Sequence, residues 1–137
     1  MLTRLFRINA IAFCLALSCL VSTDAATRLP VTGQCRGTDT SIVKRIRFAR
    51  GRTTAVVKDT IRLCTSHEYT LKASAGQKMS LHLATGKRTS MTLYAPNGDT
   101  LLDGGMDWEG ELPESGNYTV QIGTDATARY TLEVTIR

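Results

Sequence analysis

Two histidines are the side chains of this chain best suited to acid–base catalysis. His67 and His82 are the only histidines, and a hydrolase would need one of them beside a nucleophile and an orienting group. The sequence contains neither a GxSxG nor an HExxH pattern, so neither histidine stands in a recognisable catalytic motif. Both occupy strand positions that we expect to face outward. The sequence therefore predicts surface histidines and a protein that is not an enzyme.

Carboxylates gather in one short hairpin and offer a second kind of chemistry. The six are Asp99, Asp103, Asp107, Glu109, Glu111 and Glu114. Paired carboxylates could cut a glycosidic bond, and hard oxygen ligands could bind Ca²⁺. Because the spacing matches no EF-hand loop, a solvated hairpin is the favoured interpretation and Ca²⁺ binding is the alternative. Two distant histidines and two cysteines also lack the spacing of a metal site, so we expect no metal and no other cofactor.

The stretch LPESGNYT, residues 112–119, presents hydrogen-bonding groups on a turn. Pro113 fixes one backbone dihedral, Gly116 tolerates a left-handed conformation, and Ser115 bonds readily to nearby backbone groups. Tyr118 begins a run of alternating apolar residues, so its ring should point inward with its hydroxyl group at the rim. The stretch is explained either as a structural turn or as an exposed loop whose Ser and Tyr enter the cleft of another protein.

The elements that must position these residues are strands. From Ile42 onward apolar and polar residues alternate with a period of two, and turn signals recur at intervals of about ten residues. The strongest is APNGD, residues 95–99, because Pro presets one dihedral and Asn-Gly supplies positive φ. The sequence therefore predicts an all-β fold, a single antiparallel β-sandwich of jelly-roll type with eight or nine strands over residues 42–137.

Residues 1–25 have the organisation of a secretory signal peptide. Arg4 and Arg7 precede the apolar run Ile8–Val21, and small residues lead to a cleavage site after Ala25. The apolar run is too short for a comfortable transmembrane span. We therefore expect an exported protein, periplasmic or secreted, with no transmembrane segment.

The cysteines bear on export in two ways, as an alternative lipoprotein site and as a possible disulfide. Cys19 offers an alternative lipoprotein cleavage at ALSC, which is disfavoured because Ala stands where such sites prefer Leu. Cys35, in a polar N-terminal arm of residues 26–41, and Cys64 form an even pair in a compartment where disulfides persist. A disulfide between them would close a loop of roughly 30 residues and contribute about 3 kcal/mol on the chain-entropy model.

Charge divides the chain into two parts. Arg28–Arg88 holds thirteen Lys and Arg against three Asp and Glu, whereas Thr89–Arg137 holds two against eight. These charges either face one another across strands or form a basic face and an acidic rim that steer charged partners. Export, and the lack of basic residues interleaved with aromatic ones, argue against a nucleic-acid partner.

Trp108 is the only tryptophan, and it stands between Asp107 and Glu109. Charged neighbours are consistent with an exposed ring that stacks on a sugar or makes an accessory contact to a partner. The favoured alternative is that the ring caps one end of the sandwich core.

Five pieces of sequence, in order from about Ile46 to Arg137, carry a family resemblance. They are RFARGRTTA, YTLKASAGQKMSLHL, LYAPNG, LPESGNYTVQI and YTLEVTIR. With them the chain resembles the periplasmic inhibitors of g-type lysozyme. The patterns YxLxAxAGQ and LPxSGxY are also similar to those of bacterial pre-peptidase C-terminal domains, which are β-sandwiches.

The inhibitor resemblance implies a protein partner, lysozyme, whose cleft would receive a Ser-Gly-x-Tyr loop. The matching loop residues are Ser115, Gly116, Asn117 and Tyr118. Lys87 and Arg88, on a TGKR turn, would add charge attraction if that turn lies at the same end of the sandwich. The pre-peptidase resemblance implies the alternative, a non-catalytic module that binds a glycan, an envelope component or a protein.

Overall fold

The structure, a computed structural model, describes residues 40–86 and 88–137. All described residues belong to one compact unit. The described part contains nine strands: β1 (Thr40–Arg45), β2 (Thr54–Ile61), β3 (Thr65–Ala73), β4 (Lys78–Thr85), β5 (Thr89–Tyr94), β6 (Thr100–Gly105), β7 (Asp107–Glu111), β8 (Gly116–Thr124) and β9 (Ala128–Ile136). The first strand of the described part begins at Thr40. The predicted signal peptide, Cys19 and residues 26–39 of the polar arm lie outside the described residues.

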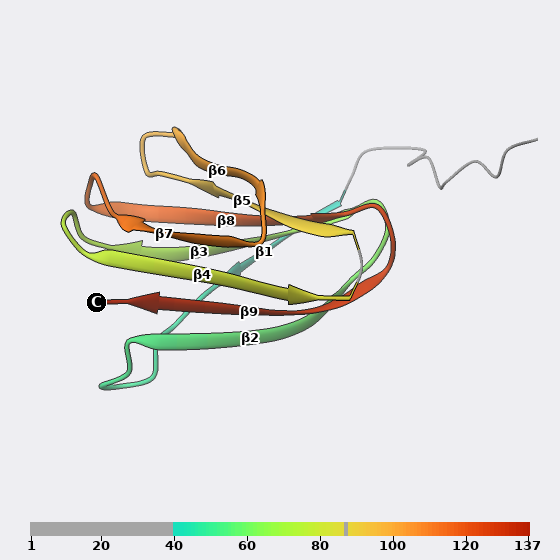
Figure 1. Ribbon diagram of the computed structural model, residues 1–137, viewed down its shortest axis with the longest axis horizontal. Coiled ribbons are helices and arrows are strands. Elements are labelled where there is room, and N and C mark those ends of the chain that lie inside the picture. Colours follow the sequence, from blue (N-terminus) through green and yellow to red (C-terminus); the bar gives the residue numbers. More distant parts are fainter. Residues whose placement is uncertain (1–39, 87) are drawn as a thin grey trace, which may run out of the picture. The chain divides into compact units, whose positions relative to one another are not determined.

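The strands form two sheets, which Figure 1 shows as two layers. One sheet has the order β1-β3-β8-β5-β6 and the other the order β2-β9-β4-β7. For β2 to β9 this is the winding of a jelly roll, with successive strands changing sheet except at β5–β6. The predicted all-β sandwich is confirmed. One pairing departs from the antiparallel expectation, because the chain crosses to β2 between β1 and β3, and these two strands run parallel.

Alternating side chains from both sheets fill the space between the layers. Leu71, Leu83, Leu93, Val120 and Leu132, one from each of five strands, are completely buried. Full burial of such a side chain contributes about 1.5–3 kcal/mol. Register shifts are therefore disfavoured, since a slip of one residue would turn this apolar set toward water.

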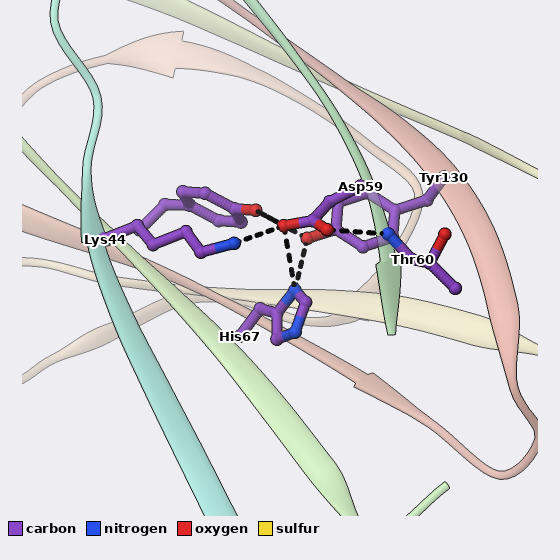
Figure 2. Close-up of polar contacts among 6 residues, drawn as sticks. Lys44, Asp59, Thr60, His67 and Tyr130 are labelled. Atoms are coloured by element: carbon purple, nitrogen blue, oxygen red, sulfur yellow. Dashed lines mark hydrogen bonds and ion pairs between the residues drawn. The ribbon is translucent and has the colours of Figure 1, made fainter. Parts of the chain in front are cut away.

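Polar side chains join the two layers at the side where β1 and β2 are the edge strands (Figure 2). Lys44 of β1 forms an ion pair with Asp59 of β2. The Tyr69 hydroxyl donates to the Asp59 carboxylate at 3.3 Å, and the Tyr69 and Tyr130 hydroxyl oxygens lie 2.6 Å apart. His67 Nδ1 lies 2.7 Å from the Tyr130 hydroxyl.

The number of available protons determines which group donates in each of these hydrogen bonds. Each phenol has one proton. Because that of Tyr69 goes to Asp59, Tyr130 donates to Tyr69, and His67 donates from Nδ1 to Tyr130. This direction requires a proton on His67 Nδ1, which the neutral ring and the charged ring can both supply. Burial lowers the pKa of His67, and the hydrogen bond from Lys44 holds the pKa of Asp59 below its ordinary value.

The prediction that both histidines lie at the surface is wrong for His67. Its exposed fraction is 3%, because it has the same parity along β3 as the inward-facing Tyr69 and Leu71. His82 is exposed, as predicted, and its pKa is raised by a hydrogen bond to Asp107.

We expect acid to destabilise the fold through His67. The unfolded chain binds a proton at the ordinary pKa of 6.5, whereas the buried ring binds it only at lower pH. Stability should therefore be fully present above about pH 6.5 and should fall as the pH drops toward the folded-state pKa, by up to about 1.4 kcal/mol per pH unit. Denaturant unfolding of His67→Gln should lack this slope. In a His82→Gln control the slope should remain, and a slope that persists in His67→Gln would contradict the assignment.

Candidate functional site

The loop between β7 and β8 meets two other turns at one end of the sandwich. Gly76 N donates to Leu112 O at 2.9 Å, and Leu112 N donates to Gln77 O at 2.8 Å. Asn97 N donates to Glu114 Oε1 at 3.2 Å. Residues 74–77, 95–99 and 112–115 therefore form one structural unit, which we call the Ser115 end.

Tyr118 holds this loop from inside the core. Its side chain is completely buried. Its hydroxyl donates to Glu114 O at 2.7 Å and lies 3.3 Å from Glu114 N, which donates to it. The ring points inward as expected, but the hydroxyl is used within the loop. Tyr118 can therefore contribute to partner binding only by positioning the loop.

Ser115 and Gly116 are fixed by the two neighbouring turns. Ser115 is exposed, and its Oγ accepts a hydrogen bond from Ala75 N at 2.9 Å. A Cβ atom at position 116 would lie 2.6 Å from the Cβ of Pro96. Glycine is therefore required here by the close approach of the 95–99 turn. That turn has the predicted form, with a hydrogen bond from Ala95 N to Asp99 O at 2.8 Å and Gly98 at φ 92°.

Asn117 is the next exposed residue of the loop. It begins the outward-facing row of β8 and lies directly opposite Lys72 of β3. Sequence motifs did not single out Lys72, although its outward parity on β3 could be read from the alternation. Ser115 and Asn117 thus provide the exposed polar groups of the Ser-Gly-x-Tyr element, and Tyr118 provides its support.

The proposed accessory residues are not gathered at the Ser115 end. Arg88 lies at the opposite end, between β4 and β5, where its Nε is 3.2 Å from Asp125 Oδ2. Lys87 lies outside the described residues. Trp108, on the edge strand β7, is half-buried opposite Leu81 and packs against the core.

The disulfide stays a prediction, because Cys35 lies outside the described residues. Cys64 lies in the turn before β3 with φ 62°. Within residues 40–86 and 88–137, no group of three or more His, Cys, Asp and Glu side chains is arranged to hold a metal ion. The same residues include no helix with the length and apolar character of a membrane span.

Chemically, the Ser115 end is suited to binding. Its exposed polar residues include Ser115, Asn97 and Asp99, on a backbone fixed by hydrogen bonds. His67, Tyr69 and Tyr130 are buried between the layers, where their polar atoms bond to one another.

Solved structures of similar fold come from the two groups that the motifs indicate. The g-type lysozyme inhibitor PliG of Aeromonas hydrophila, a periplasmic protein, is 26% identical, with 72% of this chain and 99% of that chain covered and a TM-score of 0.68. PliG of Salmonella Typhimurium is 20% identical, with 72% and 98% covered and a TM-score of 0.55. The pre-peptidase C-terminal domain of a Bacillus anthracis collagenase is 10% identical, with 76% and 100% covered and a TM-score of 0.54.

No protein-family model matches the chain, and no curated protein matches it. The likenesses at 20% and 10% identity concern the fold alone, whereas the Aeromonas inhibitor also shares about a quarter of the aligned residues. The resemblance that the sequence motifs indicate, to the g-type lysozyme inhibitors and to the pre-peptidase C-terminal domains, is confirmed.

Proposed function

We propose that this protein is an exported inhibitor of g-type lysozyme that occludes the enzyme's cleft with the exposed part of the Ser115 end. The observation that carries the proposal is the similarity to the Aeromonas inhibitor, which extends over 99% of that chain. The periplasmic location of the similar inhibitors, together with the predicted signal peptide, supports export.

The geometry of Ser115 supports a direct role in this binding. A serine hydroxyl has one proton and two acceptor lone pairs. One lone pair accepts from Ala75 N, which orients the oxygen and leaves the proton for a partner. A lysozyme cleft holds a catalytic carboxylic acid, which is a suitable acceptor. Because the loop is ordered by its own hydrogen bonds, little conformational entropy would be lost on binding.

A second candidate is a non-catalytic module that binds a glycan or an envelope component. The observation that favours it is a polar depression of about 480 Å³ on the outer face of the β1-containing sheet. Ser66, Ser90, Thr92, Gln121 and Gly123 are among its lining residues. Hydroxyl and amide groups of this kind could bond to sugars, and the depression does not involve the Ser115 end.

Cell-wall clearing tests the proposed function. Clearing by goose-type lysozyme should stop at near-stoichiometric ratios of the protein, and clearing by chicken-type lysozyme should continue. If neither enzyme is inhibited, the proposal is wrong. Binding of the protein to purified cell-wall glycan would then support the second candidate.

Removal of the Ser115 hydroxyl should weaken inhibition without unfolding the protein. A hydrogen bond between neutral groups contributes about 0.5–1.5 kcal/mol, so Ser115→Ala should raise the inhibition constant roughly 2- to 13-fold. The free energy of unfolding should change by only about 1 kcal/mol, since the freed Ala75 N–H is exposed to water. The matched control is Ser90→Ala on the outer face of β5, which should inhibit as the wild type does. Equal inhibition by both variants would remove Ser115 from the site.

The variant Tyr118→Phe distinguishes the contribution of the hydroxyl group from that of the ring. The ring still fills the core, but both hydrogen bonds to Glu114 are lost. We expect a stability loss of about 1–2 kcal/mol and weaker inhibition, because the loop is less ordered. Tyr118→Ala should lose about 3–5 kcal/mol by opening a cavity. The control is Tyr94→Phe, whose hydroxyl donates to Gln121 away from the loop. Undiminished inhibition by folded Tyr118→Phe would contradict the positioning role.

A further inference from the structure

Three cations gather on the outer face of the β1-containing sheet, at the corner beside the Ser115 end. Arg45, Arg47 and Lys72, the cation cluster, are all exposed. Together with Ile46 and Phe48 they line a depression of about 470 Å³. Ile46 is buried and Phe48 is half-buried against the core, so the depression combines charged walls with an apolar base.

The parallel pairing of β1 with β3 creates this cluster. Arg45 is in register with Thr70, and Ile46 N donates to Thr70 O at 2.9 Å, which continues the pairing beyond β1. The next outward position on each segment is Arg47 and Lys72. Strands in a sheet lie about 4.8 Å apart, so these two side chains are neighbours.

Fold stability does not explain the cluster. Across the described chain, no carboxylate lies within ion-pair distance of Arg45, Arg47 or Lys72. Glu68, the carboxylate on the same face of β3, instead accepts a hydrogen bond from Ser41 at 2.7 Å. Like charges on neighbouring strands are destabilising. The cluster therefore has the character of a surface kept for an anionic partner.

The cluster is continuous with the exposed loop. Lys72 lies directly opposite Asn117, and Asn117 is two residues from Ser115. A protein that covers Ser115 and Asn117 therefore also covers Lys72. The other basic turn, which includes Arg88, lies at the far end of the strands and has no such continuity.

We propose that the cation cluster is a second part of the lysozyme-binding surface and receives carboxylate groups beside the enzyme's cleft. The inference rests on the proposed function. Arg45 and Arg47 supply planar forks that match a carboxylate, and Lys72 adds a point charge next to the loop. Such a cluster raises the association rate by steering the encounter, and its effect declines as salt screens the charges.

Binding kinetics on immobilised goose-type lysozyme test the inference, at low salt and at about 0.5 M salt. The double variant Arg47→Ala/Lys72→Ala should associate roughly tenfold more slowly than the wild type at low salt, and the two should converge at high salt. The matched control, Lys58→Ala/Arg129→Ala, removes the same charge from the outer face of the β2–β9 pair. It should associate nearly as the wild type does.

The possible outcomes distinguish the role of the cation cluster from the proposed inhibition of lysozyme. If the wild type inhibits lysozyme and the cluster variant binds at the wild-type rate at both salt concentrations, the cluster is not part of the surface and the inhibitor function stands. If the association rate of the control falls as much as that of the cluster variant, the rate depends on net charge alone and the cluster is not a local binding site. If the wild type neither binds nor inhibits, both proposals fail.

Discussion

The hydrogen bond from the Tyr118 hydroxyl to the Glu114 carbonyl is the constraint on which the Ser115 end depends. It ties an exposed loop to a ring that is completely buried, so the loop cannot move far unless the core opens. The turns at 74–77 and 95–99 then bond to the same loop. Connections from both sheets are thereby fixed to one another, and Ser115 stands on a rigid base.

A second constraint acts at the open side of the sandwich. Lys44 faces inward on β1 and pairs with Asp59 on the other sheet, which adds a contact to an edge strand already paired with β3. Because side chains alternate along a strand, an inward Lys44 requires an outward Arg45. The Lys44–Asp59 ion pair and the cation cluster therefore depend on the same orientation of β1. Lys44 joins β1 to the other sheet, and Arg45 of the cluster points away from it, beside the loop.

Local patterns predict much of this arrangement and fail where topology decides. Alternation and the APNGD signal give the strands, the turn and the inward ring of Tyr118. The parity of Tyr69 and Leu71 could also have placed His67 in the core, but a titratable side chain was expected outside. The positions of Arg88 and Lys72 relative to Ser115 depend on which strands meet at which end. The parallel β1–β3 pairing joins segments about 25 residues apart and has no local signal.

The Ser115 end combines exposed carboxylates with a neighbouring group of exposed cations. Glu114 accepts from Asn97 N and Asp99 accepts from Asn97 Nδ2, while the Glu111 carboxylate beside the loop is exposed. Ser115 Oγ accepts a hydrogen bond from Ala75 N, and its own proton remains available for a partner. Beside it lie cations without a carboxylate neighbour in the described chain. A cleft with carboxyl groups needs donors and positive charge, and in the proposed contact the Ser115 hydroxyl and the cation cluster would provide them.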